Sequence, residues 1–176
     1  MIGIPGKHGG MAEEKEPAAS SWTIRPAQAE EPEWCAQLMN QSDPWITLGR
    51  TQEQCRSRCS NPEWELVVAV DSRNGSLGGF LLLDPKGVIG FPYIASVAVA
   101  AEFRNQGLGQ MLIRYVEERY QPSRKFVFLC VSSFNERARS LYVRLGFKAV
   151  GVLENFVVEG LDEWLLYKRL DRHNGI

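Results

Sequence analysis

The chain has 176 residues and a mass of 19.9 kDa, which suits one domain of ordinary size with its own core. Its 20 basic and 21 acidic residues nearly cancel, so no strong field favours nucleic acid or an anionic membrane as a partner. Apolar residues make up 44% and charged residues 23%, which excludes disorder for the bulk of the chain. No apolar run approaches the roughly 18 residues that a membrane-spanning helix needs.

Cysteine and histidine usage indicates a reducing, cytoplasmic location and no metal site. The cysteines are too few and too widely spaced for a secreted disulfide scaffold. Both histidines lie near the chain ends, so a Cys/His zinc site is not expected. Cys130 lies within the apolar run 126–131. We interpret it as a small buried hydrophobe rather than a catalytic thiol, because no histidine is available to activate it.

The composition changes near residue 20 and predicts where the folded domain begins. Residues 1–20 mix glycine, proline, alanine and charges without a period, and they lack the apolar core of a signal peptide. We expect a flexible leader over 1–20, followed by a single domain over 21–171.

The first half of the domain predicts one strand, two helices and three further strands. The ranges are 22–25 for the first strand, 28–40 and 51–60 for the helices, and 65–70, 77–83 and 88–99 for the later strands. Pro26 stops the first strand, and Thr51 can cap the second helix. Asn74-Gly75 predicts a tight hairpin because both residues tolerate positive φ. A second turn is expected at 84–87.

The second half predicts two helices and three strands. Apolar residues recur at helical spacing from Leu108 to Val116, and a second stripe runs from Ala138 to Leu145, closed by Gly146. Strands are predicted over 125–131, 147–156 and 161–170. The resulting order, βααβββαβαββ, predicts a mixed α/β fold with helices packed on one curved, mostly antiparallel sheet.

A glycine-rich turn between a predicted strand and helix is the strongest local signal. Two glycines let the backbone turn tightly, and a helix N-terminus presents free N–H groups suited to a phosphate. The segment matches neither the Walker A pattern nor the dinucleotide fingerprint. By itself it could also be an ordinary strand-to-helix turn. The turn consists of Arg104, Asn105, Gln106, Gly107, Leu108 and Gly109.

Four features in order make the chain resemble the GCN5-related N-acetyltransferase family. The turn resembles the Arg-x-x-Gly-x-Gly of that family's motif A, and Val97-Ala98-Val99 resembles its Val-x-Val strand end. Downstream, the spacing from Asn135 to Tyr142 and the string Leu-Gly-Phe at 145–147 also resemble the family pattern. The resemblance implies that fold, with splayed central strands, over residues 22–170.

The resemblance also implies acetyl-CoA as the acetyl donor and no metal. The backbone N–H groups near Gln106 to Gly109, with Arg104 beside them, would bind the pyrophosphate. Val97 and Val99 would hold the pantetheine arm through their backbone, because a bulge would splay their strand from the next. Asn135 would bind the pantetheine amides, although its side chain could equally cap a helix.

The implied chemistry is acetyl transfer to a primary amine by direct attack in a ternary complex. A backbone N–H near Val99 would stabilise the oxyanion, and Tyr142 would protonate the departing thiolate. Without the family, Tyr142 reads as a core aromatic. The acidic bases of two family branches are missing, since Tyr93 and Cys130 occupy their positions. Deprotonation could therefore use ordered water with Tyr93, or the amine could have a low pKa.

The acceptor is weakly specified, and other functions remain open. Residues expected to flank it are Asp43, Trp45, Arg50, Phe156, Glu159 and Asp162. The expected partner is a small-molecule or peptide amine, with no nucleic acid or membrane and a homodimer left open. The alternatives are a non-catalytic acyl-CoA-binding sensor and a structural protein that has kept the fold.

Overall fold

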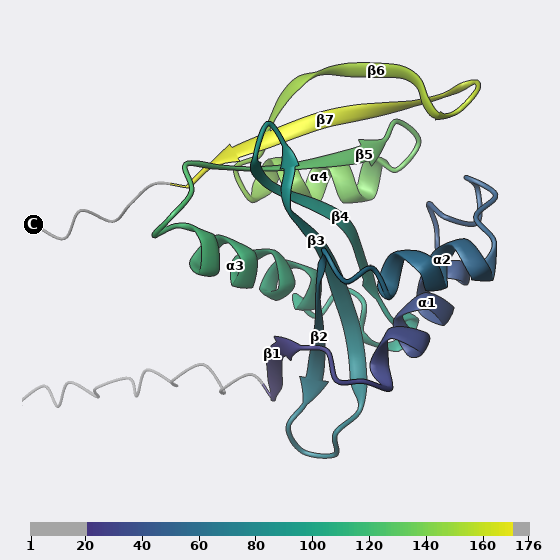
Figure 1. Cartoon of the computed structure of the whole chain (residues 1–176), viewed down its shortest axis with the longest axis vertical. Helices are drawn as coiled ribbons and strands as arrows, with labels where there is room; N and C mark the ends of the chain where they lie inside the picture. Colours follow the sequence, from purple (N-terminus) through teal and green to yellow (C-terminus); the bar gives the residue numbers. More distant parts are fainter. Residues whose placement is uncertain (1–20, 171–176) are drawn as a thin grey trace, which may run out of the picture.

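The computed structural model describes residues 21–170, so the predicted leader lies outside the described residues. The elements follow the predicted order, with a short 3-10 turn added before α3 (Figure 1). No helix in the described range is long and apolar enough to cross a membrane. The elements are β1 (Trp22–Pro26), α1 (Glu31–Asn40), α2 (Gln52–Cys59), β2 (Glu65–Asp71), β3 (Leu77–Val88), β4 (Phe91–Val99), η1 (Ala101–Phe103), α3 (Leu108–Tyr120), β5 (Phe126–Ser132), α4 (Glu136–Arg144), β6 (Lys148–Val158) and β7 (Leu161–Arg169).

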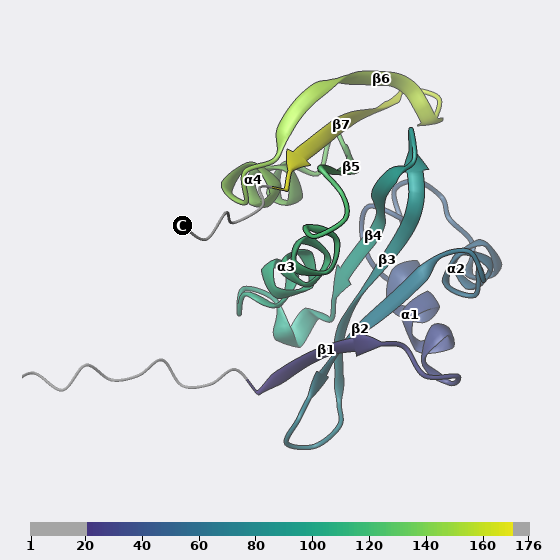
Figure 2. The ribbon, with the colours of Figure 1, turned by 60° about the vertical axis from the view of Figure 1, so that its left-hand side comes forward.

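The strands form one seven-stranded sheet in the order β1-β2-β3-β4-β5-β7-β6. Neighbouring strands are antiparallel except β4 and β5, which confirms the predicted mostly antiparallel sheet. Helices α1 and α2 cover one face and α3 the other (Figures 1 and 2). Two apolar clusters fill these layers, one around α3 with Leu112 and Ile113, the other around α1 and α2 with Met39 and Phe80.

β4 and β5 pair over a short stretch and then separate. Their register contains only Tyr93↔Phe128 and Ile94↔Leu129. In the pairing of β3 with β4, Leu82 opposes Ser96 and Leu83 opposes Ile94, so one residue of β4 is extra. That residue is Ala95, and such a bulge bends and twists its strand. The sheet is therefore open between β5 and the end of β4, which the family resemblance implied.

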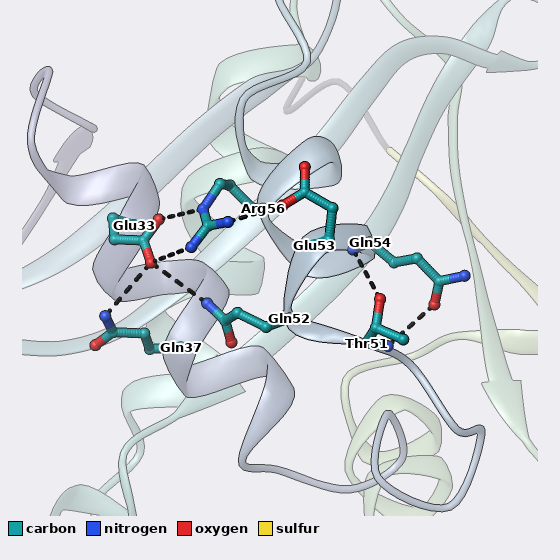
Figure 3. A network of polar contacts seen from close by, with 7 residues as sticks. All are labelled: Glu33, Gln37, Thr51, Gln52, Glu53, Gln54 and Arg56. Atoms are coloured by element: carbon teal, nitrogen blue, oxygen red, sulfur yellow. Dashed lines mark hydrogen bonds and ion pairs between the residues drawn. The ribbon is translucent and has the colours of Figure 1, made fainter.

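Polar contacts join α1 to α2 (Figure 3). Glu33 of α1 accepts from Arg56 Nε at 2.7 Å and from its NH2 at 3.0 Å, so the ion pair is bidentate. Thr51 and Gln54 form a capping box that starts α2 at the predicted place. Arg56 points toward α1, away from the sheet-facing side of α2.

Of the two predicted turns, the hairpin at Asn74-Gly75 is confirmed and the one at 84–87 was wrong. The second turn lies at Ile89-Gly90, where φ is 49° and 79°, rather than at 84–87. Residues 85–87 instead bulge out of the β3–β4 pairing, since Asp84 still opposes Tyr93 and Val88 opposes Phe91. The first hairpin forms where Asn74-Gly75 predicted it, but its conformation differs from the expected one with positive φ at both residues. Gly75 alone takes positive φ, and its N–H bonds back to the Asp71 carbonyl at 2.8 Å.

Candidate functional site

The open side of β4 presents unpaired backbone groups. Ala100 N donates to Gly78 O of β3 at 2.9 Å. N–H directions alternate along an antiparallel strand, so the backbone N–H and C=O groups of Val97 and Val99 point away from β3. They face the gap that β5 leaves beyond Ile94. This is the strand edge along which an extended chain with amide groups can bind.

The glycine turn places a helix N-terminus beside this strand edge. Gly107 is the N-cap of α3 with φ at +81°, which requires glycine. Gly109 has no such requirement, because it lies within the helix. A Cβ there would meet Leu141 and Val99 methyl groups at 3.7 and 3.8 Å, which is ordinary contact. The protein itself therefore leaves room at Gly109, and glycine keeps that surface open for a ligand.

The first backbone N–H groups of α3 make no hydrogen bond within the described part of the chain. No acceptor among residues 21–170 takes a hydrogen bond from the backbone N–H of Leu108, Gly109 or Gln110. The three N–H groups begin α3, where the helix dipole adds positive potential. The turn can therefore bind an anionic oxygen without displacing a contact of its own.

The polar side chains of the turn contact neighbouring backbone or side-chain groups. Arg104 is exposed, and its Nε donates to Val99 O at 3.0 Å, so it lies across the end of β4. Its terminal nitrogens have no partner among the described residues. Gln106 Nε2 donates to Glu102 O at 3.0 Å, and Asn105 Oδ1 accepts from Arg137. Arg137 is a cation beside the turn that the sequence did not single out.

α4 brings Asn135 and Tyr142 to the same opening. Asn135 caps the helix, with its Oδ1 accepting from Ala138 N at 3.2 Å, so the capping interpretation is confirmed. Tyr142 packs edge-on against Phe147, with ring centroids 5.9 Å apart. Its hydroxyl bonds to no residue within 21–170. Burial raises the pKa of Tyr142 to about 12, so the phenol keeps its proton at neutral pH.

Two adjoining cavities lie at the opening between β4 and β5. One, of about 650 Å³, runs along Val99 and the glycine turn. The other, of about 610 Å³, lies beside Trp45 and Arg58. Both are lined by Val97, Asn135 and Tyr142. Of the predicted acceptor-side residues, Asp43, Trp45, Arg50 and Phe156 line the second cavity, whereas Glu159 and Asp162 do not.

Tyr93 and Cys130 meet in the cavity beside Trp45. Cys130 is only partly buried and lines this cavity, so its predicted place within the core was wrong. Burial raises the pKa of the Cys130 thiol, and the neighbouring Tyr93 hydroxyl opposes this rise. Burial, and then the contact with Cys130, raises the pKa of Tyr93 above its usual range. The phenol is therefore a proton donor here.

Glu163 is a buried carboxylate in this cavity that sequence reasoning missed. It is 4% exposed, on β7, and its Oε1 accepts from Ser132 Oγ at 2.6 Å. β7 pairs Glu163 with Ser132 and Leu165 with Cys130, which brings the carboxylate to the strand position beside Cys130. Burial raises the pKa of Glu163, opposed by the Ser132 hydrogen bond. A buried carboxylate whose pKa is raised is a stronger proton acceptor than an exposed one, which makes Glu163 a candidate general base.

Comparison with known proteins gives the following likenesses. An N-alpha-acetyltransferase of Sulfurisphaera tokodaii is 33% identical over 78 residues, which are 42% of this chain and 46% of that protein. The chain thus spans about half the length of this curated relative.

Solved structures agree in fold. NAA60 of Arabidopsis thaliana, in complex with a bisubstrate analogue, has 20% identity and a TM-score of 0.70, covering 85% of this chain and 99% of that one. A GNAT family acetyltransferase from Elizabethkingia anophelis, with acetyl-CoA bound, has 24% identity and a TM-score of 0.69, covering 85% and 99%.

The family model described as "Acetyltransferase (GNAT) family" matches residues 26–147. This range runs from the end of β1 to the residue before β6, and it contains the opening between β4 and β5, the glycine turn and α4. The chain belongs to the GNAT family of acetyltransferases.

Proposed function

We propose that the protein transfers the acetyl group of acetyl-CoA to a primary amine by direct attack within a ternary complex. The observation that carries the proposal is that the two cavities share Val97, Asn135 and Tyr142. A donor along the glycine turn and an acceptor beside Trp45 would meet at these residues. Reactants held side by side need no acyl-enzyme, because positioning itself lowers the barrier.

The residues beside α3 fit the pyrophosphate and pantetheine of acetyl-CoA. The free N–H groups of Leu108 to Gln110 suit the pyrophosphate, and Gly109 leaves space for it. The outward N–H and C=O of Val97 and the N–H of Val99 suit the pantetheine amides, with the Asn135 amide nitrogen as a further donor, whereas the Val99 carbonyl already accepts from Arg104. A GNAT structure that aligns with this chain contains acetyl-CoA. Acetyl-CoA supplies the activated acetyl group.

The proton path uses Glu163 and Tyr142. An alkyl ammonium has a pKa of about 10.4 and must lose a proton before the nitrogen can attack. Glu163 accepts that proton, because it is the buried carboxylate of the acceptor cavity. The Tyr93 hydroxyl orients the amine or a water molecule beside it. A backbone N–H near Val99 stabilises the oxyanion, and Tyr142 donates its proton to the leaving sulfur.

A thiol-release assay with acetyl-CoA tests the proposal. Amino acids, polyamines, aminoglycosides and short peptides are offered as acceptors, and products are identified by mass spectrometry. We expect CoA release that depends on the amine and yields its N-acetyl derivative. Tight CoA binding without amine-dependent release from any acceptor would replace the proposal with an acyl-CoA sensor.

Replacing Arg104 tests the cofactor side separately. We expect Arg104→Ala to weaken CoA binding by about 1 kcal/mol, about fivefold, since an exposed cation is partly screened by water. Isothermal titration calorimetry with CoA measures this loss. Arg114→Ala is the matched control, because Arg114 is an exposed cation of α3 that lines neither cavity. Equal affinities for the two variants would remove Arg104 from the site.

A further inference from the structure

Two arginines line the acceptor cavity without a carboxylate partner. Arg50 and Arg58 both face the cavity of about 610 Å³. The ion pairs among residues 21–170 include neither of them. Each guanidinium stays charged in a protein, and two that lie close together repel. Such a pair beside a cavity is suited to an anion.

Arg58 is held by contacts that leave its charge uncompensated. Its NH2 group donates to Ala95 O at 3.3 Å, and its guanidinium lies 5.0 Å from the centroid of the Trp64 ring. Its Nε is buried and has no hydrogen-bond partner within residues 21–170. Burial lowers the pKa of Arg58, and repulsion from Arg50 adds to this effect. An anion bound in the cavity beside Arg58 and Arg50 would relieve their repulsion.

The carboxylates of the same cavity are engaged elsewhere. Asp43 Oδ1 accepts from Thr47 Oγ1 at 2.7 Å, and Asp84 Oδ1 accepts from Lys86 N at 2.9 Å. Glu163 accepts from Ser132. None of them forms an ion pair with either arginine. The three carboxylates keep their negative charge, but none of them binds a guanidinium, so Arg50 and Arg58 can still bind an anion in the cavity.

The neighbouring arginine on α2 shows the contrast. Arg56 precedes Arg58 by two residues, which places the two side chains about 200° apart around the helix. Arg56 is neutralised by Glu33 and Glu53, at 2.7 and 2.8 Å (Figure 3). The helix thus neutralises its outward arginine and leaves its inward one without a counter-charge.

We propose that the acceptor is a primary amine with a carboxylate close to its amino group, and that Arg58, assisted by Arg50, binds that carboxylate. The inference rests on the proposed acetyl transfer and names its substrate class.

The position of Arg58 favours the carboxylate of an α-amino acid. Arg58 is anchored at the carbonyl of Ala95, two residues before Val97, which lines both cavities. In an α-amino acid the amino nitrogen and carboxyl carbon are joined by two bonds of about 1.5 Å each. A carboxylate bound by Arg58 beside Ala95 would thus keep the amino nitrogen close to the cavity junction at Val97. An acidic side chain in a peptide's second residue would need a longer path.

Matched acceptors test the inference. The first ratio compares kcat/KM for an L-amino acid with kcat/KM for its α-carboxamide. The second compares a dipeptide amide with glutamate as its second residue with one that has glutamine there. The two substrates of each ratio are measured with the same protein variant under the same conditions. We expect the wild type to favour the amino acid over its carboxamide, and Arg58→Gln to reduce that ratio at least about tenfold. Arg56→Gln is the control and is expected to leave the ratio unchanged.

The ratio that changes in Arg58→Gln shows whether the subsite binds an α-carboxylate or an acidic side chain. A change confined to the amino acids identifies the α-carboxylate, and a change confined to the dipeptides identifies the acidic side chain. Either supports the carboxylate subsite. If acids and amides are both acetylated and Arg58→Gln leaves both ratios unchanged, the carboxylate subsite is overturned, whereas the proposed acetyl transfer stands.

A binding measurement keeps the inference testable without turnover. N-acetyl-L-amino acids and their amides are titrated into the CoA-saturated protein by calorimetry, with thermal unfolding as the check that each variant is folded. We expect the acids to bind more tightly to the wild type, and this difference to disappear in Arg58→Gln. No difference in the wild type would contradict the inference even if no acceptor is turned over.

Discussion

Replacing Glu163 by glutamine is expected to lower kcat/KM by about 10²- to 10⁴-fold, the range that a positioned general base contributes. Glutamine has nearly the same shape, and its amide oxygen can still accept from Ser132 Oγ. The substitution therefore removes proton acceptance and leaves the packing in place. Steady-state kinetics with the best acceptor measure the loss.

Glu163→Gln is expected to lower activity without lowering the stability of the fold. Burial raises the pKa of Glu163, so the folded protein binds this proton more tightly than the unfolded chain, whose ordinary carboxyl pKa is about 4.3. The free energy of unfolding then falls as the pH rises from that value through the raised pKa. Glu163→Gln should be as stable as the wild type at pH 7 or more stable, with a flatter pH dependence of Tm. A structural role for Glu163 would instead lower Tm and spare kcat.

The pH–rate profile separates Glu163 from Tyr93. We expect the acidic limb of kcat/KM that belongs to Glu163 to be absent in the glutamine variant and retained in Tyr93→Phe. Wild-type kinetics in Glu163→Gln would exclude Glu163 as the proton acceptor and return that role to ordered water.

Replacing Tyr142 by phenylalanine is expected to lower kcat about 10²-fold with little change in CoA affinity. The value lies at the low end for general acid catalysis, because a thiol with a pKa of about 8.5 is already a fair leaving group. Burial raises the pKa of Tyr142 to about 12, so the wild-type hydroxyl is fully protonated at the working pH. Phenylalanine keeps the contact of the ring with Phe147.

The matched control is Tyr115→Phe. Tyr115 is a partly buried tyrosine of α3 that packs against the same core and lines neither cavity. Kinetics and CoA titrations on both variants separate turnover from affinity. Equal turnover of Tyr142→Phe and the wild type would show that the thiolate leaves without this proton.

The sequence predicted the elements well where one short-range signal dominates. Apolar spacing located α3, and Thr51 located the start of α2. The turn at 84–87 was misplaced because Asp-Pro and Gly are typical turn residues, whereas here they form a bulge within the β3–β4 pairing. Whether such residues form a turn or a bulge depends on the strand register, which no local pattern encodes.

The site residues that belong to sequence motifs could be predicted, whereas those brought in by strand pairing or helix packing could not. The glycine turn, Asn135 and Tyr142 belong to spaced motifs, and the fold places them at one opening. Glu163 was missed because it reaches the position beside Cys130 from β7, through pairing over 31 residues of sequence. Arg58 was also missed, because it lies on a polar helix whose residue pattern does not show which side faces a cavity. Only the packing of α2 on the sheet shows that it faces the cavity.

Titration of CoA into the wild type and Gly109→Ala tests most directly whether the start of α3 binds the diphosphate. Alanine is favoured over glycine in a helix by up to about 1 kcal/mol, and its Cβ would make only ordinary contacts here. We predict measurable binding of CoA to the wild type, and for Gly109→Ala a Tm at least as high with affinity at least about tenfold weaker. No binding of CoA to the wild type at millimolar concentration, or equal affinity of the two proteins, would contradict the account.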